Sequence, residues 1–232
     1  MPKLCIVPTP IGNLEDITLR AIRMLKQSEV IFAEDTRVTR VLLSHLDIHK
    51  RLVSFHTNNE HAQLEEAIRL IQAHTLVALV SDAGTPGISD PGFLLVRACI
   101  ENQIEVECLP GPTAFVPALV VSGLSGDRFF FEGFLPHKKG RQSRLEYLAT
   151  LEHTVILYES PYRLNKTLQQ IVQFMGPSRR ISVSKEISKI YELHFRGTAE
   201  EAVAYFSNLA VKGEFVVVVG KEKSSLPSLD NA

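Results

Sequence analysis

The first half of the chain alternates short apolar runs with amphipathic stretches, and this alternation restricts the possible folds more than any other feature. Apolar side chains recur at helical spacing in the stretches, whereas the short apolar runs are typical of buried strands. Such alternation predicts an α/β fold, with a mostly parallel sheet and helices on both faces. Strands are predicted at residues 4–7, 30–33, 52–55, 76–80 and 106–109, and helices at 18–27, 38–46, 62–73 and 92–101.

The second half has a different pattern, which predicts a smaller α+β domain with a mixed sheet. Residues 193–195 alternate with polar neighbours, as in an antiparallel strand exposed on one face. Gly, Ser and Asp residues near 122–127 suit a linker. We therefore expect domains at residues 1–122 and 127–223. Strands are predicted at 129–131, 154–158, 181–184, 193–195 and 215–219, and helices at 141–151, 164–174 and 199–209.

Composition excludes several classes of protein. Hydrophobic residues make up 45% of the 232 residues and charged residues 22%, as in globular rather than disordered proteins. No apolar run approaches the roughly 20 residues of a membrane helix. The first residues lack the apolar stretch of a signal peptide. We therefore expect a cytoplasmic protein with no membrane partner, and no Cys or His spacing indicates a metal site.

The charge balance leaves nucleic-acid binding to local patches. A formal net charge of −1 does not by itself indicate a nucleic-acid binder. The run from His137 to Arg144 holds four basic residues and no acid, so it is a candidate patch. A solvated helix start is the alternative interpretation of the same run.

Each predicted strand of the first half is followed by residues that an ordinary loop does not need. Since ligands of open α/β sheets bind at the carboxyl ends of the strands, these clusters would form one site. Helix capping by Asp35 or Thr36, or helix entry at Asp90-Pro91, is the alternative. Capping does not account for Arg37 or His56. The clusters lie at residues 8–13, 34–37, 56–60, 81–92 and 110–114.

The loop at residues 81–92 contains three glycines and two prolines. It matches neither the P-loop pattern nor the G-x-G-x-x-G pattern of dinucleotide sites. Glycines still allow the backbone to approach a ligand closely, and prolines stiffen the loop so that less entropy is lost on binding. The residues alone therefore predict a rigid, backbone-lined ligand site without identifying the ligand.

The order of these motifs resembles a known family. Nearly the whole chain, from residue 4 to about residue 220, is similar to the small-subunit ribosomal RNA methyltransferase I family of the tetrapyrrole-methylase superfamily. The matching segments are 6–14 (IVPTPIGNL), 33–37 (AEDTR), 80–86 (VSDAGTP), 90–92 (DPG), 109–112 (LPGP), 131–136 (FEGFLP), 158–160 (YES) and 213–215 (GEF).

The resemblance implies two α/β domains with the active site in the cleft between them, and a homodimer. It implies S-adenosyl-L-methionine as methyl donor, no metal, and 2′-O-methylation of a cytidine in the decoding region of 16S rRNA, as free RNA or in the small ribosomal subunit. Donor contacts are implied at Pro8, Asp82, Ala83, Gly84, Thr85, Ile88, Thr113, Ala114, Tyr158 and Glu159.

The catalytic candidates are the polar side chains of two strand-end clusters. A carboxylate or an imidazole within hydrogen-bond reach could accept the proton of the 2′-hydroxyl, and a guanidinium could hold a phosphate or the ribose edge. Glu159 is a further candidate base. The catalytic candidates are Glu34, Asp35, Arg37, His56 and Glu60.

The sequence departs from the family pattern at two positions. Tyr162 stands where a histidine is common, and Lys185 replaces an arginine. Many members also carry a further helical domain, to which the resemblance does not extend, so the sequence leaves open how RNA is held. The alternatives are a methyltransferase of the same fold with a tetrapyrrole or protein acceptor, and a non-catalytic RNA-binding relative.

Overall fold

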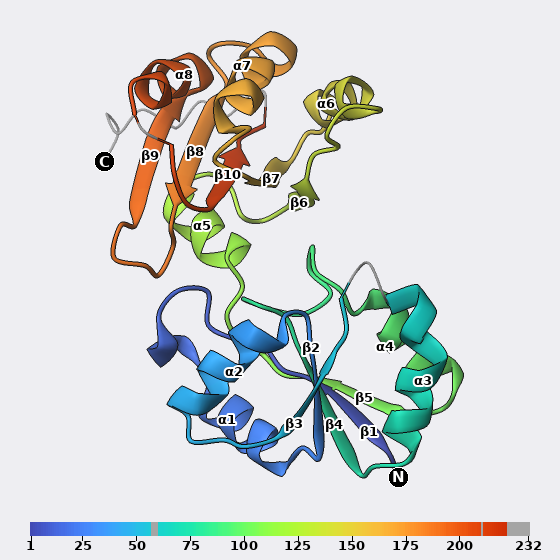
Figure 1. The fold of residues 1–232 in the computed structure, drawn as a ribbon. Helices are drawn as coiled ribbons and strands as arrows, with labels where there is room; N and C mark the ends of the chain where they lie inside the picture. The colour runs from blue at the N-terminus through green and yellow to red at the C-terminus, as the bar shows by residue number, and fades with distance from the viewer. Residues whose placement is uncertain (57–59, 210, 222–232) are drawn as a thin grey trace. The chain divides into compact units, whose positions relative to one another are not determined.

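The structure of the protein is a computed structural model that describes residues 1–56, 60–209 and 211–221. The chain divides into two compact units, Met1–Thr113 and Ala114–Ala232, each built on its own sheet (Figure 1). The predicted division at 122–127 lies after the first helix of the second unit rather than before it. This division is structural, and the functional domains at residues 1–122 and 127–223 stay a prediction.

The first unit contains a five-stranded sheet in the order β3-β2-β4-β1-β5. All four strand pairs are parallel, as the alternation of strands and helices predicts. The central strand β4 is buried from Val77 to Val80, as expected of a strand covered on both faces. The strands are β1 (Lys3–Ile6), β2 (Val30–Ala33), β3 (Arg51–Ser54), β4 (Leu76–Val80) and β5 (Glu105–Cys108).

Helices cover both faces of this sheet (Figure 1). On one face, α1 and α2 pack over a core that includes Leu25 and Leu43; on the other, α3 and α4 pack over a core that includes Ile71 and Leu95. The chain therefore leaves the adjacent strands β1 and β4 toward opposite faces, which is the topological switch point where open α/β sheets bind ligands. The helices are α1 (Leu19–Gln27), α2 (Thr36–His45), α3 (Glu60–Gln72) and α4 (Phe93–Glu101), with a 3₁₀ turn, η1, at Leu14–Asp16.

The second unit contains a mixed sheet in the order β6-β7-β10-β8-β9. The pair β6–β7 is parallel and the other three pairs are antiparallel, so the predicted mixed sheet is confirmed. The strands are β6 (Phe129–Phe134), β7 (Thr154–Glu159), β8 (Arg180–Lys185), β9 (Leu193–Thr198) and β10 (Phe215–Val219).

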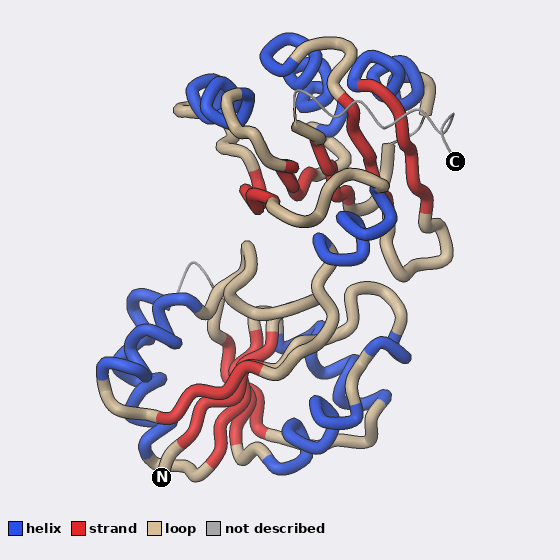
Figure 2. Tube along the Cα trace, turned by 180° about the vertical axis from the view of Figure 1, so that it is seen from behind, coloured by secondary structure: helices blue, strands red, loops and turns tan. Residues whose placement is uncertain are grey.

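Two layers of helices enclose the second sheet (Figure 2). On one face, α6 (Arg141–Ala149), α7 (Leu164–Met175) and α8 (Ala199–Ser207) share the larger core with residues such as Leu157 and Val217. On the other face, α5 (Phe115–Ser122) packs over Ile156 and Val218. The side chains of β7 and β10 therefore alternate between two cores.

The structure differs from the sequence prediction at two helices. Helix α5 was not predicted, because its sequence FVPALVVS is apolar on all sides and shows no helical contrast of polar and apolar residues. Helix α4 begins at Phe93, after Gly92 with φ +136°, so Asp90-Pro91 does not form its entry. Within the described residues, no helix combines the length and apolar character needed to cross a membrane.

Candidate functional site

Backbone hydrogen bonds join the loops that follow β1 and β4. Thr9 N–H donates to the carbonyl of Gly84 and Gly84 N–H donates to the carbonyl of Thr9, both at 2.9 Å. The buried Thr9 hydroxyl also donates to the carbonyl of Ser81 at 3.2 Å. The two loops therefore form one rigid backbone surface across the switch point.

The loop after β5 joins the same surface. The Thr85 hydroxyl donates to the carbonyl of Pro112 at 3.0 Å, and it lies 2.7 Å from the hydroxyl of Thr113. Gly111 packs directly on Pro8, where an added Cβ would stand 2.6 Å from the proline Cβ. Only glycine allows this approach, so three strand ends meet in one backbone-lined surface.

Two acidic side chains tie the ends of the neighbouring strands β2 and β4. Asp82 N–H donates to Glu34 Oε2 at 3.2 Å, and Asp35 N–H donates to Asp82 Oδ1 at 3.0 Å. Asp35 also caps α2, since Arg37 N–H donates to its Oδ1 at 2.8 Å. The capping interpretation is therefore confirmed for Asp35.

The acidic groups of this corner differ in their electrostatic environment. The Arg37 guanidinium donates hydrogen bonds to the Asp35 carboxylate, with Nη2 2.6 Å from Oδ2. These hydrogen bonds lower the pKa of Asp35 to about 2. Desolvation raises the pKa of the half-buried Glu34 above its ordinary value. It also raises the pKa of the Asp82 carboxyl, although that residue as a whole is exposed. Glu34 and Asp82 are thus better suited than Asp35 to accept a proton near neutral pH.

The remaining catalytic candidates of the first unit lie beyond β3. His56 is half-buried and follows that strand, and Glu60 opens α3. The loop after β4 reaches this cluster, since Gly92 N–H donates to Glu60 Oε2 at 3.4 Å. Thr57, Asn58 and Asn59, which belong to the same predicted cluster, lie outside the described residues.

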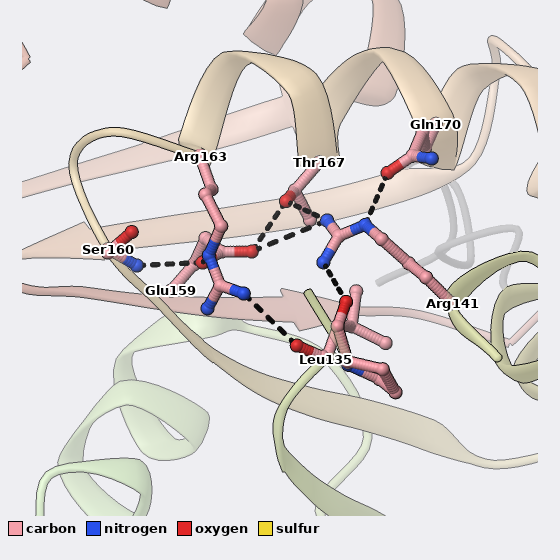
Figure 3. Close-up of polar contacts among 8 residues, drawn as sticks. Leu135, Arg141, Glu159, Ser160, Arg163, Thr167 and Gln170 are labelled. Atoms are coloured by element: carbon pink, nitrogen blue, oxygen red, sulfur yellow. Dashed lines mark hydrogen bonds and ion pairs between the residues drawn. The ribbon is translucent and has the colours of Figure 1, made fainter. Parts of the chain in front are cut away.

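In the second unit, the end of β7 is held by a buried carboxylate (Figure 3). The side chain of Glu159 is 0% exposed. Its Oε1 accepts from Ser160 N–H and pairs with Arg163 Nε, both at 2.8 Å. Its Oε2 accepts from the Thr167 hydroxyl at 2.5 Å. The carboxylate thereby connects the strand end, the following loop and the first turn of α7.

Arg141 completes this network from α6 (Figure 3). Its Nη2 donates to the Thr167 hydroxyl at 2.6 Å and lies 3.6 Å from Glu159 Oε2. Its Nη1 donates to the carbonyl of Pro136 at 3.1 Å and its Nε donates to Gln170 Oε1 at 2.8 Å. Burial lowers the pKa of Arg141, but the neighbouring carboxylate opposes that shift.

These contacts change the interpretation of the basic run at residues 137–144. Arg141 is 4% exposed, so the prediction of a surface patch was wrong for this residue. Arg144 donates to Glu132 Oε1 at 2.7 Å and stacks on the Tyr147 ring. Lys138 and Lys139 stay exposed and are what remains of the patch.

The predicted donor contacts are distributed over both units. In the second unit, Ala114 and Tyr158 pack against the core beneath α5, and the Tyr158 ring lies 5.1 Å from that of Phe131. Arg163 and Thr167, which hold Glu159, were missed. They are four residues apart, as on one face of a helix, but Glu159 ends β7, so their spacing carries no signal that they hold it. In the first unit lie Pro8, Asp82, Ala83, Gly84, Thr85, Ile88 and Thr113.

Within the described residues, no group of three or more His, Cys, Asp or Glu side chains could hold a metal ion.

Comparison with known proteins identifies the family. A family model described as Tetrapyrrole (Corrin/Porphyrin) Methylases matches residues 3–203. Solved structures share the fold: uroporphyrin-III C-methyltransferase of Thermus thermophilus, complexed with S-adenyl homocysteine, has a TM-score of 0.66 at 21% identity, covering 94% of this chain and 97% of its own. The methyltransferase CobJ has a TM-score of 0.70 at 20% identity, covering 95% of each chain.

Relatives found by sequence are more similar to the chain than these solved structures are. The ribosomal RNA small subunit methyltransferase I of Synechocystis sp. is 48% identical over 97% of this chain and 81% of its own length. That of Thermotoga maritima is 45% identical over 96% of this chain and 100% of its own. The chain therefore belongs to the tetrapyrrole methylase family and, within it, to the ribosomal RNA small subunit methyltransferase I family.

Proposed function

We propose that the protein transfers a methyl group from S-adenosyl-L-methionine to the 2′-hydroxyl of a cytidine in the decoding region of 16S rRNA. The relatives named as ribosomal RNA small subunit methyltransferases support the reaction and the RNA substrate. The observation that carries the proposal is the joined, backbone-lined surface beside the carboxyls of Glu34 and Asp82.

The residues of this surface fit a small donor molecule. Ala83 and Gly87 are exposed and present little beyond backbone, so a flat ligand can approach the main chain closely. The bonds made by Thr9 and Thr85 hold the loops in place before any ligand arrives, so binding orders few groups. When bound, the donor would supply an activated methyl group.

We propose Glu34 as the general base for the acceptor hydroxyl. Its carboxyl is half-buried at the end of β2 and its pKa is raised, which brings it toward the working pH. Asp35 is the weaker candidate, because its carboxylate is paired with Arg37. Arg37 is 86% exposed, so one edge of its guanidinium can contact a phosphate while the other contacts Asp35.

We propose that His56 and Glu60 complete the acceptor side, and that Ala114, Tyr158 and the strand end at Glu159 contribute to the donor site. The buried contacts of Glu159 support a positioning role for it rather than proton transfer, because its side chain is 0% exposed. We also propose that the protein acts in the cytoplasm as a homodimer, on the small ribosomal subunit or its free RNA.

The first experiment is methyl transfer from labelled S-adenosyl-L-methionine to unmodified small ribosomal subunits, with mapping of the modified sugar. We expect a single 2′-O-methylcytidine in the decoding region. Label on a base, a protein or a tetrapyrrole would overturn the proposed acceptor. Failure to bind the donor at all would favour a non-catalytic relative.

A further inference from the structure

A polar cavity lies away from the strand-end surface, between the end of α2 and the start of β3. Its volume is about 280 Å³. Leu43 and Ile48 are buried core residues, and four of the seven lining residues have polar side chains. The cavity is lined by Arg40, Leu43, Ser44, Ile48, His49, Lys50 and Leu52.

The cavity carries an excess of positive charge. The ion pairs of this region join Arg37 to Asp35 and His49 to Asp47, and they leave Arg40 and Lys50 without an acidic partner among the described residues. The Asp47 carboxylate lies 3.6 Å from His49 and its side chain is 96% exposed, so solvent screens it. The lining of the cavity itself contains two permanent cations and no acidic residue.

The end of α2 does not repel an anion as a bare helix C-terminus would. The last carbonyls of a helix carry partial negative charge when they have no partner. Here Leu46 N–H donates to the carbonyl of Leu42 at 3.1 Å, and Ile48 N–H donates to that of Leu43 at 2.9 Å. Asp47 N–H donates to the carbonyl of Ser44 at 3.3 Å. Three of the last four carbonyls of α2 are thus already hydrogen-bonded.

Helix α2 also links the cavity to the proposed acceptor site. Arg37, Arg40 and Ser44 are spaced by three and four residues, so they lie on one face of α2. Arg37 is at the end that holds Asp35, and Ser44 is at the end that lines the cavity. The helix has 10 residues and so spans about 15 Å, which is long enough to follow a nucleic-acid backbone across more than one phosphate.

We infer that Arg40, Ser44 and Lys50 form a phosphate-binding pocket for the backbone of the RNA substrate, beyond the nucleotide that is methylated. The inference depends on the proposed function in taking RNA as the ligand. A phosphodiester suits the pocket because it is anionic and accepts hydrogen bonds from a guanidinium, an ammonium and a hydroxyl. Such a contact is independent of base identity, so it would add affinity and register rather than sequence specificity.

The test compares Arg40→Glu, Lys50→Glu and the double variant with a control that carries the same charge change elsewhere. The control is Arg69→Glu with Arg97→Glu, two exposed residues of α3 and α4 on the opposite face of the sheet. Binding is measured to protein-free 16S rRNA and to unmodified small subunits over a series of salt concentrations. Donor binding and methyl transfer are measured on the same preparations.

We expect the double variant to bind protein-free 16S rRNA roughly tenfold more weakly at 0.1 M salt, with a salt-dependence slope smaller by about 2. Donor binding stays unchanged, and the control variant binds RNA like the wild type. Methyl transfer then falls through KM for the RNA rather than through kcat.

Three outcomes would overturn the inference: RNA binding equal in the variants and the wild type, an equal loss in the control, or a loss confined to assembled subunits. The last would indicate a ribosomal protein as the partner of the pocket. Failure of the proposed function is distinguishable, because the wild type would then methylate no subunits. RNA binding by the variants would still decide the role of the pocket, and a wild type that binds no RNA would refute it.

Discussion

Arg141 and Glu159 form an ion pair inside the second unit, with Nη2 3.6 Å from Oε2 and side chains 4% and 0% exposed. Removing the carboxylate would leave Arg141 and Arg163 without their anionic partner. We therefore expect Glu159→Ala to lower the free energy of unfolding by about 3–5 kcal/mol, the usual cost of an uncompensated buried charge. Urea unfolding would measure the change.

A matched control for this prediction is the exposed pair of Arg97 and Glu101 on α4. Glu101→Ala should cost less than about 1 kcal/mol, because solvent screens a surface pair. Equal effects of the two variants would show that the Glu159 network contributes no more than an ordinary surface contact.

The environment of Glu34 predicts the pH dependence of transfer. A general base must be deprotonated, and desolvation keeps Glu34 protonated to a higher pH than the ordinary 4.5. As pH falls, kcat/KM should therefore decline through a pKa above that value. Glu34→Gln should abolish transfer at every pH and retain donor binding.

The carboxyl of Asp82 could produce a similar acidic limb, since its pKa is raised as well. The Asp82→Asn variant separates the two groups. If Glu34 is the base, the acidic limb persists in this variant, with weaker donor binding as its main effect. Disappearance of the limb in Asp82→Asn alone would assign it to Asp82 instead.

The pair of Asp35 and Arg37 should matter for the acceptor rather than for the donor. Asp35→Ala or Arg37→Ala is expected to abolish methyl transfer and leave donor affinity within about twofold, because the two side chains pair with each other at the start of α2. Arg37→Lys keeps the positive charge but loses the planar guanidinium that can form two parallel hydrogen bonds, so it should retain only part of the wild-type activity. Isothermal calorimetry and a transfer assay would check both quantities. Loss of donor binding or of folding would contradict this role.

The same pair also contributes to stability, with a defined dependence on pH. The native pKa of Asp35, about 2, lies below the unfolded value of about 3.9. The stabilisation is therefore fully present above the unfolded pKa and is lost as pH falls toward 2. The difference in unfolding midpoint between the wild type and Arg37→Ala should shrink over that window. A difference that persists to about pH 2 would need another origin.

The contact of Gly111 with Pro8 should be required for donor binding. Gly111→Ala places a Cβ 2.6 Å from the proline ring, so the loops after β1 and β5 must separate. We expect donor affinity to fall at least about tenfold, with a loss of roughly 1–3 kcal/mol in stability from overpacking. Gly126→Ala is the control, since its new Cβ meets only Leu119 at ordinary contact distances. Donor affinity like that of the wild type in Gly111→Ala would show that the loops can yield.

Much of the fold follows from patterns that are local in the sequence. The apolar run of β4 and the strand–helix alternation predict a parallel sheet, and the strand order then places five loop clusters at one edge. Helix α5 is not predicted from the sequence, because a helix that is apolar on all sides shows no periodic alternation of polar and apolar residues. The bounds of the neighbouring helices α4 and α6 agree with the predicted ranges to within two residues.

The site was predictable in its location but not in its pairings. The sequence identifies Glu34, Asp35 and Asp82 as strand-end residues, yet only the structure shows which carboxylate accepts from which amide. Arg141 illustrates the same limit. The nearby Lys138 and Lys139 are exposed, whereas its partner Glu159 is 18 positions away and meets it only after β7 and α7 have packed.

The position of β10 in the second sheet has a consequence for synthesis. All five of its residues are buried, and it is the strand that separates β7 from β8. Until residue 219 has left the ribosomal exit tunnel, β6–β7 and β8–β9 are two separate ribbons with unpaired edges. Such edges are prone to pair with other chains. The nascent second unit is therefore most exposed to aggregation just before its last strand arrives, so a ribosome stalled short of that point would release a chain in need of a chaperone.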